Sequence, residues 1–342
     1  MQDCFCNLAQ NRGNFGRKKR GSKISRDKDK NVFLNSDLVI TGANGFVGTS
    51  FLEFLSTLDD HQLPKNIYLI GRSECFKNNR TLEKLRTNTV YLKADLTKEW
   101  DFEIQRANLI NLAADGSATS YSDEACESFV QIGKNMVNWA TRNSVSALFH
   151  ASSGAVTSSY RPPSSDSFLG ISTTNKVNFI ESRKFVEELL NDFSKKDLAK
   201  IKVARLFSFI GPNILEKKQY AVSSFIHQAV SNREIDVLGN PKSIRSYLNH
   251  KDLSRAIHDC LSGSEKFIKF SIGSTDEITM AELAEFIASE TNSSVKYSNI
   301  DAPGDYYAVE IDSETDKLST KETVNWQDSI RECLKFAKEN CN

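Results

Sequence analysis

The chain has 342 residues, 39% of them hydrophobic and 26% charged, which excludes collagen-like, coiled-coil and wholly disordered classes. Lysine plus arginine equal aspartate plus glutamate at 44 each, so no overall charge draws the chain to nucleic acid or to a membrane surface. Because no apolar run approaches the ~18 residues of a membrane-spanning helix, we expect a soluble protein with no membrane partner.

The charge is distributed unevenly along the chain. Residues 1–31 hold nine lysines and arginines against three aspartates, which predicts a basic disordered tail over residues 1–35. This opening stretch has no apolar segment of the kind found in secretory signals. The seven cysteines are scattered without the paired spacing of a metal site. We therefore expect a cytoplasmic protein with reduced thiols and no metal.

From residue 37, short apolar runs alternate with amphipathic stretches, a pattern typical of a parallel sheet with helical crossovers. The predicted strands are Leu38–Thr41, Ile67–Ile70, Val90–Ala94, Leu109–Leu112, Leu148–Ala151 and Val203–Phe207. The predicted helices between them are Thr49–Leu58, Ser128–Arg142 and Phe179–Phe193. The fold class is therefore α/β, with a Rossmann-type doubly wound parallel sheet over residues 36–210 and ligands at the carboxyl ends of its strands.

After residue 211 this alternation weakens. Loops with proline and glycine separate predicted helices near Val222–Asn232, Leu253–Gly263 and Met280–Glu290. We expect residues 211–342 to form a smaller C-terminal lobe that caps the sheet, with some of the chain returning to the sheet.

The clearest motif is the run TGANGFVG over residues 41–48, between a predicted strand and a predicted helix. Gly42 permits a tight turn, Gly45 lets the backbone approach a diphosphate, and Gly48 lets the helix pack closely on the sheet. The free N–H groups at the helix start favour a negative charge. We therefore expect a dinucleotide coenzyme to be held by Gly42, Asn44, Gly45, Phe46, Val47 and Gly48.

The next two strand ends bear on the choice of coenzyme. A carboxylate that holds the ribose 2′-hydroxyl of NAD would follow the second strand, but Gly71 and Arg72 stand there. Arg72 suits the 2′-phosphate of NADP, so we favour NADP over NAD, with a plain surface charge as the other interpretation. Asp95, followed by Leu96, either accepts a hydrogen bond from the adenine amino group or caps the segment after it.

Four further segments follow in order along the chain. They are Asn111–Ala114 (NLAA), His150–Val156 (HASSGAV), Arg205–Pro212 (RLFSFIGP) and Arg245–Leu253 (RSYLNHKDL). Together with the glycine motif, they resemble the extended short-chain dehydrogenase/reductase family, especially its NAD(P)-dependent nucleotide-sugar epimerase and dehydratase type. The resemblance covers approximately residues 37–335.

This resemblance implies a role for several residues. Ala113 and Ala114 would pass beneath the nicotinamide half of the coenzyme, Ser153 would hydrogen-bond the substrate oxygen, and Arg245 would bind the substrate diphosphate. The smaller lobe would bind a nucleotide sugar. The resemblance also implies a homodimer formed through the helix that contains Phe179.

The tyrosine that transfers the proton in this family, with a lysine four residues later, is missing. Alignment places Phe179 and Arg183 at these two positions, and phenylalanine cannot transfer a proton. Arg183 can still donate to the nicotinamide ribose and supply positive charge. The side chains that remain open as a substitute acid or base are Tyr160, His150, Lys176 and His227.

Two hypotheses from different classes follow. The first is an NAD(P)-dependent epimerase or ketoreductase that acts on a nucleotide sugar through a non-standard active site. Elimination of water is disfavoured because no Asp-Glu pair follows Ser153. The second is a catalytically impaired NAD(P)-binding sensor or scaffold. A third hypothesis is a reductase of acyl thioesters, which the cofactor region also resembles. The segment Arg245–Leu253 argues against it.

Overall fold

The structure is a computed structural model that describes Phe33 and residues 36–72, 83–85, 88–114, 121–157, 173–216, 220–301, 304–309 and 322–340. Of the predicted basic tail, only Phe33 lies within the described residues. Its side chain is fully buried and packs edge-on against the imidazole of His258, with 5.5 Å between the ring centroids. Phe33 therefore belongs to the folded core, although it falls inside the predicted tail.

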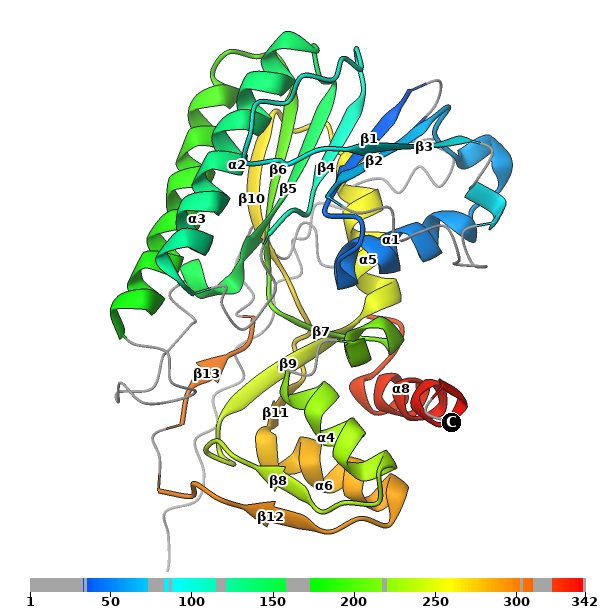
Figure 1. Ribbon diagram of the computed structural model, residues 1–342, viewed down its shortest axis with the longest axis vertical. Coiled ribbons are helices and arrows are strands. Elements are labelled where there is room, and N and C mark those ends of the chain that lie inside the picture. Colours follow the sequence, from blue (N-terminus) through cyan, green and yellow to red (C-terminus); the bar gives the residue numbers. More distant parts are fainter. Residues whose placement is uncertain are drawn as a thin grey trace, which may run out of the picture.

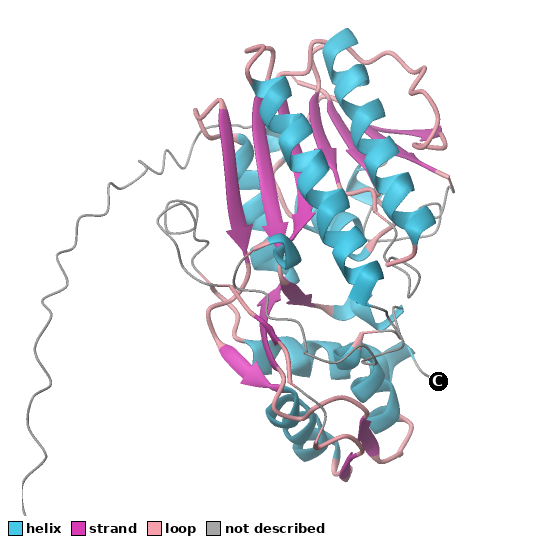
Figure 2. Ribbon diagram, turned by 90° about the vertical axis from the view of Figure 1, so that its left-hand side faces the viewer, coloured by secondary structure: helices cyan, strands magenta, loops and turns pink. Residues whose placement is uncertain are grey.

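The centre of the fold is a seven-stranded sheet in which every neighbouring pair runs parallel. Its strands are β1 (Leu38–Thr41), β2 (Ile67–Gly71), β3 (Thr89–Lys93), β4 (Asn108–Asn111), β5 (Ala147–Ser153), β6 (Lys200–Leu206) and β10 (Phe267–Ile272). Across the sheet the order is β10-β6-β5-β4-β1-β2-β3, so the chain winds outward from β1 first in one direction and then in the other. The predicted doubly wound sheet is confirmed, and the carboxyl ends of its strands point toward the smaller lobe (Figure 2).

Helices cover both faces of this sheet, one pair on each face (Figure 1). One face carries α1 (Phe46–Ser56) and α5 (His250–Leu261), and the other carries α2 (Asp123–Arg142) and α3 (Thr173–Ser194). Because both faces are covered, the central strands carry apolar side chains toward both layers of helices, which is why the sequence shows short apolar runs rather than strict alternation.

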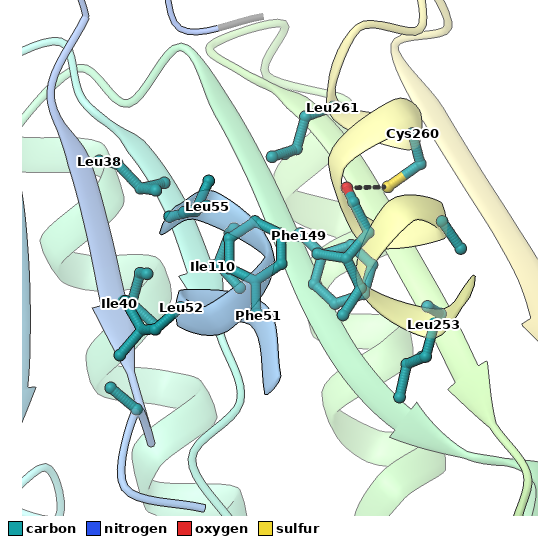
Figure 3. Packing of buried hydrophobic residues seen from close by; sticks show 14 of the residues in the cluster. Leu38, Ile40, Phe51, Leu52, Leu55, Ile110, Phe149, Leu253, Cys260 and Leu261 are labelled. Carbon is teal, nitrogen blue, oxygen red and sulfur yellow. Dashed lines mark hydrogen bonds between the residues drawn. The ribbon is translucent and has the colours of Figure 1, made fainter. Parts of the chain in front are cut away.

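Alternate residues of one strand serve the two cores. Leu38 and Ile40 lie in the core beneath α1 and α5, whereas Val39 lies in the core beneath α2 and α3. Figure 3 shows Phe51 of α1 and Phe149 of β5 in the first of these cores. β1 thus packs against both layers of helices directly before the glycine motif.

The predicted starts of α2 and α3 are the furthest from the observed ones. α2 begins at Asp123 and α3 at Thr173, where Ser128 and Phe179 were the expected first residues. The first two residues of α2 are acidic and exposed, and Ser122 caps the helix by accepting a backbone N–H at 3.2 Å. Apolar periodicity does not mark these first positions, which contributes to the late predicted start of α2.

The remaining elements form the smaller lobe, beyond the carboxyl ends of the large sheet (Figure 1). They are β7 (Ser208–Ile210), α4 (Ala221–Val230), β8 (Ile235–Val237), β9 (Ile244–Asn249), β11 (Glu277–Thr279), α6 (Met280–Thr291), β12 (Val295–Tyr297), β13 (Tyr306–Tyr307) and α8 (Trp326–Asn340). β9 pairs with β7, β11 and β13, and α4, α6 and α8 enclose a separate apolar core. α8 was not predicted. α5 and β10 follow residue 211 in the chain, yet they pack with the large sheet.

A charged cluster joins α8 of the smaller lobe to the helices beside the large sheet. Glu332 on α8 accepts a hydrogen bond from Lys251 at 2.7 Å and lies 3.6 Å from Nε2 of His250. Glu53 on α1 lies 3.9 Å from Nδ1 of the same ring. The imidazole of His250 and the ammonium of Lys251 lower the pKa of Glu332 to about 2, although burial opposes this.

Replacing Glu332 with glutamine is expected to lower the free energy of unfolding by about 2 kcal/mol at neutral pH, a figure reduced because the side chain is 32% exposed. Since folding lowers the pKa of this carboxyl from 4.5 to about 2, its contribution is complete above 4.5 and is lost as the pH falls toward 2. Urea unfolding at several pH values measures the difference between parent and variant. The control is Glu339→Gln, which changes a 61% exposed carboxylate of the same helix. A difference that stays constant with pH would contradict this assignment.

Candidate active site

The glycine motif forms the turn between β1 and α1. Gly42 has a φ of +72°, and a Cβ atom there would lie 2.6 Å from the carbonyl carbon of Leu112. Gly45 donates its N–H to the carbonyl oxygen of Gly42 at 3.0 Å. A Cβ atom at Gly48 would lie 2.5 Å from Cα of Ala43. The turn and the close packing of α1 therefore both require glycine.

The start of α1 is open to an anion. No side chain caps it, and no acidic residue lies in its first turn. The first N–H groups of a helix have no partner within the helix, and the helix dipole adds partial positive charge there. Phe46, the first residue of α1, stacks on Phe209 of β7 with 5.0 Å between centroids and 7° between planes. The loop thus fits the diphosphate of a dinucleotide and contacts the smaller lobe.

The other residues expected to hold the coenzyme lie at neighbouring strand ends. Asp95, after β3, accepts hydrogen bonds from the hydroxyl and the N–H of Thr97 at 2.8 and 3.1 Å. These bonds lower its pKa, and the charge of Arg72 after β2 adds to the effect. Asp95 thus stabilises the turn after β3, and the side chain of Arg72 is exposed. Leu96 and Ala113 are buried, whereas Ala114 is exposed.

A buried polar chain lies beneath the loop. The hydroxyl of Thr41 donates to Oδ1 of Asn111, and Nδ2 of Asn111 lies 2.9 Å from Nδ1 of His150. Burial, and then the charge of Arg183, lower the pKa of His150 to about 3. The imidazole is therefore neutral at physiological pH and accepts the amide hydrogen. This chain joins β1, β4 and β5 and explains the polar residues inside an otherwise apolar sheet.

Ser153 ends β5 at the carboxyl edge of the sheet. Its Oγ accepts the N–H of Ala155 at 3.2 Å and so caps the 3-10 turn Gly154–Val156. The hydroxyl of Tyr307 from β13 lies 3.4 Å from the same Oγ. A residue of the smaller lobe therefore reaches the side chain that was expected to contact the substrate oxygen.

The preceding residue, Ser152, is tied to a buried ion pair. Its hydroxyl donates to Glu187 of α3 at 2.6 Å. Arg205 of β6 donates to the two carboxylate oxygens of Glu187 at 3.0 and 2.7 Å. The carboxylate side chain is 2% exposed. This network fixes α3 to the ends of β5 and β6 and thereby sets the position of Ser153.

The two residues of α3 that stand where the resemblance predicted tyrosine and lysine stack on each other. The guanidinium carbon of Arg183 lies 3.7 Å from the ring centroid of Phe179 and 4.0 Å from that of Phe129. The ring of Phe179 also contacts that of Tyr121, with 4.6 Å between centroids. Arg183 is 4% exposed, so its positive charge is held in an aromatic environment. Phe179 offers no hydroxyl to Ser153.

Arg245, the residue expected to bind a substrate diphosphate, lies on β9. It donates to the two carboxylate oxygens of Asp305 at 2.9 and 2.8 Å. Burial opposes the charged form, yet the hydrogen bonds with Asp305 leave the pKa of Arg245 above its ordinary value. A substrate would therefore meet an ion pair at this place rather than an isolated cation.

Comparison with known proteins identifies the family of the chain. The family model described as the NAD dependent epimerase/dehydratase family matches residues 38–273. The chain belongs to this family.

Curated relatives of this epimerase/dehydratase family member include two plant enzymes. UDP-glucuronic acid decarboxylase 4 of Arabidopsis thaliana is 25% identical over 260 residues, which cover 73% of this chain and 56% of that protein. UDP-glucuronic acid decarboxylase 3 of the same plant is 24% identical over 317 residues, which cover 90% of this chain and 89% of that protein. The match thus spans little more than half the length of the first of these relatives.

Solved structures of epimerases share the fold. An epimerase of Methanothermobacter thermautotrophicus gives a TM-score of 0.72 at 17% identity, covering 91% of this chain and 94% of that one. UDP-glucose 4-epimerase of Thermotoga maritima, solved with UDP-glucose, gives 0.71 at 16% identity, covering 90% and 100%. At these identities the likeness establishes the fold, including the smaller lobe.

The side chains left open as substitutes for the tyrosine lie in different places. His150 is the buried neutral imidazole described above. His227 lies on α4, where its Nε2 is 2.7 Å from the carbonyl oxygen of Leu215 inside the smaller lobe. The side chains of Tyr160 and Lys176 lie outside the described residues. Neither histidine contacts Ser153.

Several residues of the site were not predicted from the sequence. They include Tyr307 on β13, Asp305 directly before it, and Glu187 on α3. Only Asp305 had a signal, because the sequence Pro303-Gly304 predicts a loop before it. Tertiary packing brings Tyr307 to Ser153 and Glu187 to Ser152.

The described residues contain no group of three or more histidine, cysteine, aspartate or glutamate side chains arranged to hold a metal ion. They also contain no helix that combines the length and apolarity needed to span a bilayer.

Proposed function

We propose that this member of the epimerase/dehydratase family is an NAD(P)-dependent epimerase or ketoreductase that acts on a nucleotide sugar with a non-standard active site. The observation that carries the proposal is the glycine turn, with the uncapped start of α1, at the same edge of the sheet as Ser153. A nicotinamide coenzyme would supply the hydride chemistry, which the side chains at this edge cannot perform.

On the coenzyme side, Gly42, Gly45 and Gly48 would allow the diphosphate to approach the backbone of α1, with Phe46 and Val47 contributing N–H groups. Asn44 lies within this turn. Arg72 would receive the 2′-phosphate, which favours NADP over NAD. Asp95 and Leu96 would border the adenine. Ala113, Ala114 and Arg183 would lie along the nicotinamide half.

On the substrate side, Ser153 would hydrogen-bond the reacting oxygen, and the pair of Arg245 and Asp305 would meet the nucleotide. An ion pair can serve a nucleotide diphosphate and ribose together, because the guanidinium donates hydrogen bonds to phosphate and the carboxylate accepts them from hydroxyls. The names of the relatives, which act on or bind UDP-sugars, support a nucleotide sugar. A homodimer is also proposed, and sedimentation velocity tests it.

A second candidate function is a catalytically impaired sensor or scaffold that binds NAD(P). The observation that favours it is the stack of Phe179 on Arg183, which fills the place of a proton-transfer pair with an aromatic ring and a cation. Such a protein would bind coenzyme and nucleotide sugar without turnover.

Calorimetric titration with NADPH and NADH tests the proposal first. We expect NADPH to bind about tenfold more tightly, because a charge-assisted contact with Arg72 is worth roughly 1.4 kcal/mol. Arg72→Gln should remove this preference.

Incubation with UDP-glucose, UDP-N-acetylglucosamine, UDP-glucuronic acid and their 4-keto derivatives then tests turnover. Binding of coenzyme with no product from any of these sugars would favour the impaired sensor. Activity created by the double variant Phe179→Tyr with Arg183→Lys would favour it further. No binding of either coenzyme would overturn both functions.

A further inference from the structure

The proposed chemistry needs a proton-transfer group beside Ser153, and the described side chains of α3 do not provide one. Phe179 has no hydroxyl, Nδ1 of His150 is hydrogen-bonded to Asn111, and Nε2 of His150 is buried without a hydrogen bond to Ser153. Among the described tyrosines, one places its hydroxyl against Ser153. It is Tyr307, whose Oη lies 3.4 Å from Oγ of Ser153 and donates to the carbonyl oxygen of Leu206 at 3.1 Å.

We propose that Tyr307 is the proton donor of this active site, so that the phenol comes from strand β13 of the smaller lobe instead of from helix α3. This inference rests on the proposed function, because it assigns a residue to that same reaction. The step in which Tyr307 would donate its proton is the reduction of a ketone on a bound nucleotide sugar.

The separation of the two hydroxyl groups suits a shared acceptor. Each O–H group forms its hydrogen bond at about 2.7–2.8 Å, so oxygens 3.4 Å apart can both reach one carbonyl oxygen placed between them. Ser153 keeps its bond from the N–H of Ala155 and still has its own hydrogen to donate. Tyr307 has one hydrogen, which it donates to Leu206 in this structure. A substrate carbonyl would take the place of that backbone oxygen.

The position of Tyr307 is fixed by strong contacts on both sides. β13 pairs with β9 in a register that sets Tyr307 against Arg245. Two residues earlier, Asp305 holds the guanidinium of Arg245 through two hydrogen bonds. The phenol ring packs on Phe207 with 5.0 Å between centroids. A proton donor works best when its geometry is held in this way before substrate binds.

The environment keeps the phenol protonated. Burial raises the pKa of Tyr307 to about 12, with a smaller opposing effect from its hydrogen bond with Ser153. The other charged or titratable groups that act on it are Tyr121, Arg245 and Tyr220. At neutral pH the phenol therefore carries a proton, and its raised pKa makes it a weak acid that gives up this proton only as negative charge develops on the substrate oxygen.

A reduced nicotinamide coenzyme, when bound, would supply the hydride that adds to the carbonyl carbon and would itself be oxidised. The electron pair of the C=O π bond moves to the oxygen, and this oxygen takes the proton of Tyr307. The tyrosinate then recovers a proton from water, and the positive charge of Arg245 near the ring stabilises it in the interval.

The variant Tyr307→Phe tests this role, and Tyr306→Phe is its matched control. Tyr306 is the next residue of β13, and its hydroxyl donates to Glu277 instead of pointing toward Ser153. Single-turnover reduction of a UDP-4-keto-hexose by NADPH should slow about 100-fold in Tyr307→Phe and less than about twofold in Tyr306→Phe. Calorimetry should give unchanged affinities for NADPH and UDP-glucose in both variants, which excludes a loss of folding as the cause.

A second measurement does not depend on turnover. In protein labelled with ¹³C at tyrosine Cζ, the signal that is missing from Tyr307→Phe belongs to Tyr307. Binding of UDP-glucose together with NADP should shift this signal, because the phenol changes its hydrogen-bond partner. A parent enzyme that turns over while Tyr307→Phe retains its rate, or a bound complex with no shift, would overturn the role of Tyr307 alone. Binding without turnover by the parent would overturn the proposed function as well.

Discussion

Replacing Gly42 with alanine is expected to lower the free energy of unfolding by about 3 kcal/mol and the affinity for NADPH by about 100-fold. The φ of +72° is costly for a residue with a side chain, and the added Cβ would lie 2.6 Å from both the carbonyl carbon and the oxygen of Leu112. These are backbone atoms of the turn after β4, so they cannot move aside as the end of a side chain would. The turn must shift, and with it the start of α1.

Urea unfolding and calorimetric titration with NADPH measure the two effects. The matched control is Gly71→Ala, because the nearest atom to a Cβ there is the hydroxyl oxygen of Tyr91 at 3.6 Å, an ordinary contact. We expect this control to change the free energy of unfolding by less than about 1 kcal/mol. If Gly42→Ala bound NADPH as the parent does, the glycine turn would not be the diphosphate site.

The sequence predicted the large sheet well because its strands are covered on both faces. Leu38, Val39 and Ile40 are each fully buried, one face after the other, so the strand appears as an uninterrupted apolar run bounded by polar residues. The glycine motif is also recognised locally, from its spacing between a strand and a helix, although the close approach of Leu112 to Gly42 is a long-range contact. Features with short-range causes can be predicted from one sequence.

The contacts around Ser153 have long-range causes, and the sequence did not predict them. Ser153 and Tyr307 are 154 positions apart, and β13, which carries the tyrosine, has two residues. A strand this short has no periodicity to detect. α8 was missed for a different reason: its buried residues Trp326, Ile330 and Cys333 recur at helical spacing, but this pattern near the end of the chain was not interpreted as a helix.

The positions of the missing tyrosine and lysine were predicted, but the contacts of the residues that replace them were not. Alignment alone predicted that Phe179 and Arg183 occupy the two positions. It did not predict that the two side chains would stack, nor that Phe129 would close the other side of the guanidinium. Arg183 keeps the positive charge of the family's lysine, whereas Phe179 lacks the hydroxyl of the family's tyrosine. A phenol supplied by the smaller lobe is consistent with this arrangement, since only the proton-transfer group has to be replaced.

The largest effect of a single charge is expected at Glu187. Replacing it with glutamine should lower the free energy of unfolding by about 3 kcal/mol, because the variant removes the buried carboxylate charge that pairs with the guanidinium of Arg205, whose side chain is 25% exposed. The carboxylate is 2% exposed and accepts hydrogen bonds from both Ser152 and Arg205. Its loss also releases the end of β5, so the position of Ser153 should become less exact and single-turnover reduction should slow.

A matched control and a double variant separate these causes. Glu181→Gln changes a carboxylate of the same helix that is 61% exposed and pairs with Lys184 at 3.0 Å, and it should cost less than about 0.5 kcal/mol. Adding Arg205→Met to Glu187→Gln removes both charges, so the double variant should be more stable than the sum of the two single changes predicts. Strict additivity would mean that the pair is not coupled. In that case Ser152 would be held by α3 through packing alone, and the rate at Ser153 should then be insensitive to Glu187.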